Sequence, residues 1–366
     1  MWEGAYQAAC CDVGAEVRED VSTSGSTGAL AVRGNAFHNF SHRLTDKDVE
    51  AVVAALRGCP DVSSICFPYN SISDRGGVLL GEALSQHPDS LLTLDLQYNS
   101  LGPEAAVALA RGVESSSSLY SLLLAGNALG GQCGLAFNAA LRHNTTLTLL
   151  DLYNTDMGVQ SLVPLCRALV ENRSLVSLNI GRPLLHGPAE VASVVDHLSA
   201  ALKSNNTLEE LNVSYFGITD RELQALVLAL CVSAVTALNL KGNKLSEDAG
   251  ELLARLLDRR HDFRQLDVGC NRLRDKGARD LAKSMAQHLQ LASLGVESCT
   301  IGEVGLITLI DGLRRCVALR QLKLWGNDVT PSVAQALSRT FGDLHKMEGV
   351  DFGVEQRDGE WVAYRS

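Results

Sequence analysis

The sequence repeats one pattern of apolar residues about every 28 residues, and this repetition restricts the possible folds more than any other feature. In one copy, leucines stand at Leu91, Leu94, Leu96 and Leu101, with Asn99 between the last two. The residues that follow place small and apolar side chains at helical spacing. Each copy therefore predicts a short strand, a tight turn and an amphipathic helix.

The asparagine position of this pattern recurs along the chain. Its occupants are Asn70, Asn99, Asn127, Thr155, Pro183, Phe216, Asn243, Asn271, Cys299 and Asn327. They are 27–29 residues apart, except that 33 residues separate Pro183 from Phe216. An asparagine amide both donates and accepts, so stacked copies can satisfy buried backbone groups where the chain leaves the strand. Proline and phenylalanine cannot do this, and we expect a local disturbance of this ladder at those two positions.

The pattern resembles the ribonuclease-inhibitor-like class of leucine-rich repeats, over about residues 28–346. The resemblance implies an α/β solenoid, or horseshoe, of about 10 to 11 repeats, with a parallel sheet on the concave side and helices on the convex side. Within the class, the stretches 180–185, 350–352 and 358–362 are similar to the leucine-rich-repeat-containing protein 34 group. That group is associated with ciliated and germ cells.

The two ends of the chain depart from the repeat. Residues 1–27 include most of the small, polar run VSTSGSTG at 21–28 and are expected to form a flexible tail. In the alternative, Trp2 and Tyr6 attach this tail to a partner or to the first repeat. Residues 347–366 predict a cap, because a strand-like stretch is followed by a hairpin with Asp358-Gly359 in its turn.

One repeat, at 175–207, is five residues longer than the others. Insertions in a solenoid go to loops, so we expect a bulge after its strand. This bulge, with Arg182, Pro183 and His186, is either neutral loop drift or a docking feature for a partner.

Outward-facing strand positions and turn residues define the candidate binding surface. The strand positions form a small, polar and mildly acidic row, and aromatic residues follow at the strand ends. Exposed aromatics are typical anchors of protein interfaces, although each could instead pack on the loop of the next turn. The candidate residues are Tyr69, Asp95, Tyr98, Asp151, Tyr153, Tyr215, Asp267, Lys323 and Trp325.

The sequence argues against several kinds of function. A net charge of −10 disfavours nucleic acid and anionic membranes as partners. We find no motif for catalysis, phosphate binding or metal binding, and we expect no cofactor, no metal and no small-molecule substrate. The ten cysteines contain no C-x-x-C pair and are expected to be reduced and mostly buried.

These observations predict a non-enzymatic scaffold that binds protein partners. The resemblance implies a cytoplasmic protein in a large assembly, such as a ciliary or flagellar axoneme with its radial spokes. The alternatives are a regulator of a small GTPase, similar to the Ran activator and using Arg182, and a sensing module of the kind found in NOD-like receptors.

Overall fold

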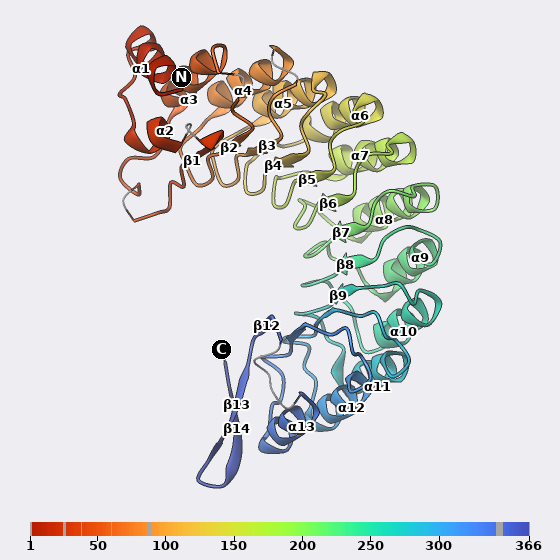
Figure 1. Cartoon of the computed structure of the whole chain (residues 1–366). Helices are drawn as coiled ribbons and strands as arrows, with labels where there is room; N and C mark the ends of the chain where they lie inside the picture. The colour runs from red at the N-terminus through yellow and green to blue at the C-terminus, as the bar shows by residue number, and fades with distance from the viewer. Residues whose placement is uncertain are drawn as a thin grey trace. The chain divides into compact units, whose positions relative to one another are not determined.

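The structure is a computed structural model that describes residues 2–24, 27–37, 39–59, 61–86, 89–341 and 347–365. The chain forms two compact units, Met1–His186 and Gly187–Ser366. In both units, short strands alternate with helices, as the repeat predicts (Figure 1).

Among its described residues, the first unit contains six parallel strands in sequence order. They are β1 (Ala29–Ala31), β2 (Ser64–Cys66), β3 (Thr93–Asp95), β4 (Ser121–Leu123), β5 (Leu149–Asp151) and β6 (Ser177–Asn179). Its helices are α1 (Trp2–Val13), α2 (Glu19–Ser24), α3 (Asp46–Leu56), α4 (Asp74–Gln86), α5 (Pro103–Ser115), α6 (Cys133–His143) and α7 (Val159–Glu171). Helices α3 to α7 lie on one side of the strand row, where each packs against the next (Figure 1).

The second unit continues the same alternation. Its parallel strands are β7 (Glu210–Asn212), β8 (Ala237–Asn239), β9 (Gln265–Asp267), β10 (Ser293–Gly295), β11 (Gln321–Lys323) and β12 (Gly349–Val350). Its helices are α8 (Pro188–Leu202), α9 (Asp220–Leu230), α10 (Ala249–Arg259), α11 (Arg274–Met285), α12 (Glu303–Leu313) and α13 (Pro331–Phe341). An antiparallel hairpin, β13 (Gly353–Arg357) and β14 (Glu360–Tyr364), packs against α13. The predicted turn residues Asp358 and Gly359 both have positive φ, as a tight two-residue hairpin turn requires.

The core is a stack of aliphatic layers. The central residue of each three-residue strand is a leucine or isoleucine in β1 to β11, and all of these are fully or almost fully buried. The neighbouring strand residues face outward because side chains alternate along a strand. Sequence periodicity therefore predicts correctly which strand residues form the core.

The asparagine ladder is confirmed. Asn127 Nδ2 donates to the carbonyls of Leu96 and Leu124 at 2.9 Å, and its Oδ1 accepts from the backbone N–H groups of Asn99 and Leu101 at 3.1 Å. Asn243, Asn271 and Asn327 make equivalent contacts in the second unit.

The ladder is altered where asparagine is replaced. The hydroxyl of Thr155 donates only within its own repeat, to the carbonyl of Leu152 at 2.8 Å. The thiol of Cys299 instead reaches the previous repeat, at the carbonyl of Val268. Threonine and cysteine thus make only some of the hydrogen bonds that an asparagine amide makes at this position.

The N-terminal segment differs from the expected flexible tail. Helix α1 packs on α3, and Trp2 and Tyr6 are buried, with stacked rings whose centroids lie 5.7 Å apart. The indole N–H of Trp2 donates to the carbonyl of Val21 at 3.0 Å. Of the two alternatives for these aromatics, packing on the first repeat is the one observed.

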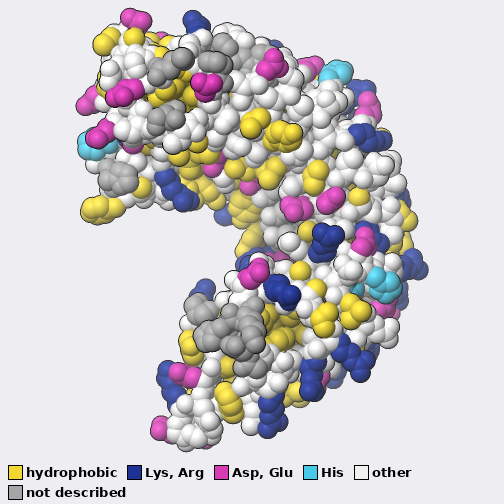
Figure 2. Space-filling model, in the orientation of Figure 1, with side chains coloured by type: hydrophobic (Ala, Val, Ile, Leu, Met, Phe, Trp, Pro, Cys, Tyr) yellow, Lys and Arg dark blue, Asp and Glu magenta, His cyan; other side chains and the backbone are white. Residues whose placement is uncertain are grey.

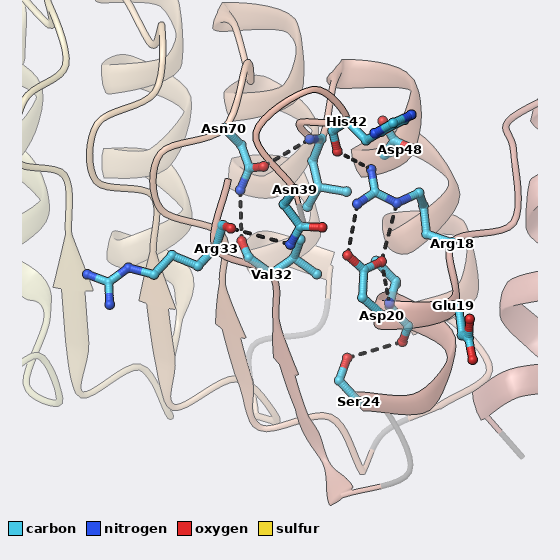
Figure 3. A network of polar contacts seen from close by, with 12 residues as sticks. Arg18, Glu19, Asp20, Ser24, Val32, Arg33, Asn39, His42, Asp48 and Asn70 are labelled. Carbon is cyan, nitrogen blue, oxygen red and sulfur yellow. Dashed lines mark hydrogen bonds and ion pairs between the residues drawn. The ribbon is translucent and has the colours of Figure 1, made fainter. Parts of the chain in front are cut away.

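A polar network connects this segment to the first repeat (Figure 3). Arg18 donates to the carbonyl of His42 at 2.6 Å and forms an ion pair with Asp20 at 2.8 Å. Beside it, Asn70 accepts from the backbone N–H of Leu44 and donates to the carbonyl of Val32. The small, polar run at 21–28 was therefore no sign that the residues before it form a flexible tail.

The long repeat also differs from the expectation. The predicted bulge after its strand is wrong, because the connection 180–187 is only one residue longer than the equivalent 152–158. Most of the insertion instead lengthens the helix and the connection 203–209, since α8 has 15 residues where α7 has 13. The five extra residues are thus distributed over the helix and the connections on both sides of it rather than forming a protrusion.

Candidate protein-binding surface

A left-handed backbone turn follows each of the strands β2 to β11. The residue directly before each ladder position has a positive φ, between 50° and 81°. These residues are Tyr69, Tyr98, Gly126, Asn154, Arg182, Tyr215, Gly242, Cys270, Ser298 and Gly326. The turn carries their side chains to the edge of the strand row, and three of the predicted anchors are among them.

In the first unit, two of these turn residues form an aromatic ledge, which we define as Tyr69 and Tyr98. Their rings stack with centroids 4.6 Å apart and an interplanar angle of 9°. The guanidinium of Arg33 lies over Tyr69, 5.6 Å from its centroid. The ring of Tyr98 also lies over Gly126, where a Cβ would come within 2.4 Å of it. Tyr98 thus packs on the next turn, which was the alternative to a role as an interface anchor. It still keeps 39% of its surface exposed.

The acidic strand positions have a structural role of their own. In the first unit, Asp95 Oδ1 accepts from the backbone N–H of Gln97, and Asp151 Oδ1 accepts from that of Tyr153. Asn179 makes the same contact with Gly181. These turns end the strands, so an aspartate or asparagine at this position is explained without a partner.

The ledge lies in an environment of mixed charge. Burial, followed by the proximity of Tyr69, Tyr153 and Asp151, raises the pKa of the Tyr98 hydroxyl, whereas Arg182 lowers it. Burial also raises the pKa of the Asp151 carboxyl. The structure therefore brings together most of the candidates of the first unit around Tyr98.

The proposed docking residues lie in the connection after β6. Arg182 is exposed, Pro183 is half-buried and His186 is exposed. The backbone between them is fixed by a hydrogen bond from the Leu184 N–H to the carbonyl of Met157, at 2.9 Å. Of the three residues, Arg182 acts electrostatically on Tyr98 of the ledge.

The second unit contains the remaining candidates. Tyr215 repeats the arrangement of Tyr98, because its ring lies over Gly242 and it is 43% exposed. Asp267 and Lys323 face the same side on strands that flank Gly295. Trp325 is half-buried and follows Lys323 on the same face.

Comparisons with known proteins agree with this geometry. A family model described as leucine-rich repeat matches residues 87–110 and 261–282. The chain is 30% identical to mouse leucine-rich repeat-containing protein 34 over 179 residues, which cover 48% of this chain and 43% of that protein. It is 29% identical to human NACHT, LRR and PYD domains-containing protein 13 over 190 residues, 50% of this chain and 18% of that protein.

This chain is a leucine-rich repeat protein. A chain of the yeast Rad7–Elc1 complex shares the fold, with a TM-score of 0.50, 16% identity, and coverage of 93% of this chain and 85% of that one. Leucine-rich repeat modules are typically non-enzymatic and present extended surfaces to other proteins. The chain spans less than half the length of the curated relatives named above.

Sequence reasoning missed several polar residues of the repeat surface. Glu297 in the second unit forms an ion pair with Lys241 across one intervening repeat, at 2.5 Å. Gly269 lies beneath this carboxylate, since a Cβ there would come within 2.4 Å of it. Two glycines were the available signal, Gly295 at the end of β10 and Gly269 two residues after β9, because they leave space that neighbouring side chains can enter.

The next observations concern metal binding, membrane spans and cysteines in the described residues. Within the described ranges, no group of three or more His, Cys, Asp or Glu side chains could hold a metal ion. The same part of the chain has no helix long and apolar enough to span a bilayer. All ten cysteines are free, and six of them are buried.

Proposed function

We propose that this leucine-rich repeat chain is a non-enzymatic scaffold that binds a protein partner within a ciliary or flagellar axoneme. The observation that carries the proposal is the aromatic ledge. Tyr69 and Tyr98 stack on each other and the ring of Tyr98 also lies over Gly126, yet Tyr98 remains exposed. Rigid, exposed tyrosines beside an arginine are favoured anchors at protein interfaces, because little side-chain entropy is lost on binding.

The axonemal setting is supported by similarity. Residues 180–185 and the C-terminal stretches 350–352 and 358–362 resemble the leucine-rich-repeat-containing protein 34 group, and the 30% identity to the mouse protein covers nearly half of the chain.

The test is co-sedimentation with axonemes. The tagged chain is expressed in ciliated cells, the membranes are removed with detergent, and the axonemal pellet is assayed for the tag. The wild-type protein is expected in the pellet, and Tyr69→Ala combined with Tyr98→Ala is expected to lower its amount at least fivefold. Tyr120→Ala is the control, because Tyr120 is 54% exposed and lies outside the ledge. A wild-type protein absent from the pellet contradicts the axonemal setting, and an undiminished double variant contradicts the role of the ledge.

A sensing module is the second candidate, favoured by the 29% identity to a NACHT, LRR and PYD domains-containing protein. In that function the repeat surface would bind a microbial ligand. Expression confined to ciliated cells would count against this candidate, whereas induction by microbial challenge in immune cells would favour it over the axonemal scaffold.

A further inference from the structure

One edge of the second unit is formed by the loops that lead from each helix into the next strand, including 260–264, 286–292 and 314–320. Backbone hydrogen bonds connect these loops in series. The N–H of Ala292 donates to the carbonyl of Arg264 at 2.7 Å, and the N–H of Arg320 donates to the carbonyl of Ala292 at 2.8 Å. At these bonds the loops are therefore held at the spacing of neighbouring strands, about 4.8 Å per repeat.

Buried side chains fasten the same loops to one another. His288 Nε2 donates to the carbonyl of Arg260 at 3.0 Å, and Cys316 Sγ donates to the carbonyl of His288 at 3.2 Å. Arg260, His288 and Cys316 are all buried. The loops thus form a connected edge whose backbone is fixed from beneath.

Two aliphatic side chains stand exposed on this edge. Leu289 and Val317 directly follow the buried His288 and Cys316, and they expose 59% and 74% of their surface. They occupy the same position in adjacent repeats, 28 residues apart. At the equivalent position the first unit has polar residues, Thr145 and Arg173. The aliphatic pair is therefore a feature of this part of the array and not of the repeat.

Positively charged side chains lie on the same loops. They are Arg264, Arg315 and Arg320, all exposed. Arg320 donates to the carbonyl of Val317 at 3.1 Å, so its guanidinium lies beside the exposed valine. Figure 2 shows that the Lys and Arg side chains visible on this unit gather mainly over helices α10 to α12, at whose ends these loops begin. We call Leu289, Val317 and the three arginines the basic rim.

The basic rim has more cations than it can pair. Neighbouring carboxylates are already engaged, because Asp262 pairs with Arg260 at 2.8 Å and Asp311 with Arg314 at 3.8 Å. No ion pair of the three rim arginines occurs within the described ranges, and Asp258, near the end of α10, has none there either. An exposed apolar pair bordered by unpaired cations matches a partner that is both apolar and acidic.

We propose that the basic rim docks an acidic amphipathic helix of a protein partner, with aliphatic side chains of the helix on Leu289 and Val317 and its carboxylates on the rim arginines. A helix rises about 5.4 Å per turn, close to the spacing of the hydrogen-bonded loops, so that each turn can meet one repeat. A guanidinium binds a carboxylate through two parallel hydrogen bonds. The proposal goes beyond the proposed function, because it depends neither on the aromatic ledge nor on the axonemal setting.

An anionic membrane matches the basic rim less well than a helix does. The chain carries a net charge of −10, and paired carboxylates lie between the arginines of this edge. A broad anionic surface would meet all of these carboxylates, whereas a narrow helix can align its own with the arginines.

The experiment uses the whole chain and a fluorescein-labelled peptide of three copies of Leu-Glu-Gln-Leu-Leu-Glu-Ala, which places its leucines on one helical face. One comparison peptide replaces every Glu by Lys, and another shuffles the acidic sequence so that the apolar face is lost. Fluorescence anisotropy measures binding. The acidic peptide is expected to bind in a saturable manner and at least tenfold more tightly than either comparison peptide, and added salt is expected to weaken its binding.

Variants locate the docking surface. Leu289→Ser combined with Val317→Ser removes the aliphatic pair, and Arg264→Glu combined with Arg315→Glu reverses two charges. Each double variant is expected to weaken binding of the acidic peptide at least fivefold. All four side chains are exposed, so the melting temperature followed by circular dichroism should stay close to that of the wild type.

The matched controls are Val304→Ser and Arg279→Glu, which change exposed residues of α12 and α11 outside the basic rim and are expected to leave the affinity unchanged. Equal binding of the lysine peptide, or wild-type affinity in either double variant, would overturn the proposal. So would a dimer in sedimentation velocity, or binding to phosphatidylserine vesicles, that the aliphatic double variant abolishes, because a second copy or a membrane would then be the occupant.

The proposal and the proposed function fail separately. Tyr69→Ala combined with Tyr98→Ala is expected to reduce axonemal co-sedimentation and to leave binding of the acidic peptide unchanged. Peptide binding that persists while the wild-type chain is absent from the axonemal pellet would contradict the axonemal setting alone. Co-sedimentation without peptide binding would contradict the basic rim alone.

Discussion

Asn127 makes hydrogen bonds with five backbone groups from two repeats, and this one side chain illustrates how the array satisfies its buried polar atoms. Asn127 is almost completely buried, so water cannot replace these contacts. The ladder asparagines are therefore expected to be the polar residues on which stability depends most.

Asn127→Ala is expected to lower the free energy of unfolding by about 1–3 kcal/mol, because it leaves buried donors and acceptors unpaired. Urea denaturation followed by circular dichroism measures this loss. Asn206→Ala is the control, since Asn206 is exposed and lies outside the ladder. Equal midpoints for the two variants would contradict the importance of the ladder.

Asp151→Asn is expected to stabilise the protein at neutral pH. Burial raises the pKa of Asp151 in the folded state, so the folded chain binds a proton more readily than the unfolded chain, and the ionised carboxylate destabilises the fold above this pKa. Asparagine retains the strand-ending hydrogen bond to the N–H of residue 153, as Asn179 does one repeat later.

Thermal melts between pH 7 and roughly pH 4, the ordinary range of aspartate titration, measure this effect. The variant should melt at a higher temperature than the wild type at pH 7, and the difference should shrink as the pH falls. A variant that is less stable at pH 7 would show that the carboxylate forms a favourable contact.

At the scale of the elements, α1 is where sequence and structure differ most. Its anchoring residues are two aromatics within a segment of little amphipathic regularity. They stack on each other, and the indole of Trp2 also donates to the carbonyl of Val21, 19 residues away. Periodicity reports only the neighbours within one element, so it could not reveal this packing.

Trp2→Ala is expected to detach α1 from α3, since truncation of a buried tryptophan costs about 3–5 kcal/mol. Hydrogen exchange read out by mass spectrometry should show faster exchange in residues 2–13, with little change in the repeats after α4. Glu3→Ala is the matched control, because Glu3 is exposed on the same helix. Unchanged protection of 2–13 in the Trp2 variant would contradict the anchoring role.

The repeat itself was predictable to the level of individual core leucines, because its strands and helices are local and its layers are nearly identical. A second buried polar column was not predicted. Asn144 and Asn172, just after α6 and α7, donate to carbonyls of the preceding repeat, Val113 and Leu141. Arg260 takes this role in the second unit, so the column has no constant residue type that a sequence pattern could show.

The candidate surface was predictable only in part, for a similar reason. Aromatics at turn positions are visible in the sequence, but the stacking of Tyr69 on Tyr98 depends on the distance between adjacent turns. The carboxylates over Gly269 and Gly295 depend on how side chains lean between strands. Such lateral contacts appear only when the repeats are stacked.

For the whole molecule, cysteine reactivity reports how burial is distributed over both units. Burial raises the pKa of Cys133, Cys166 and Cys299 to about 12, and that of Cys316 to about 11, so these thiols carry almost no thiolate at neutral pH. Cys11 and Cys270, by contrast, are exposed.

A maleimide added to the folded protein at pH 7 is expected to modify Cys11 and Cys270 first, as located by peptide mass spectrometry. In denaturing urea all ten cysteines should react, which controls for accessibility. Labelling of Cys133 or Cys316 as fast as that of Cys270 would show that the corresponding unit opens readily.

The left-handed turn before each ladder position means that the array tolerates exchange of its contact residues. A side chain in this conformation costs roughly 1–2 kcal/mol relative to glycine, and that backbone geometry already exists in every complete repeat. Tyrosine, arginine, asparagine, cysteine, serine and glycine all occupy it in this one chain. Partner choice can therefore diverge between related arrays through single replacements at this site, while the interior of each layer stays as it is.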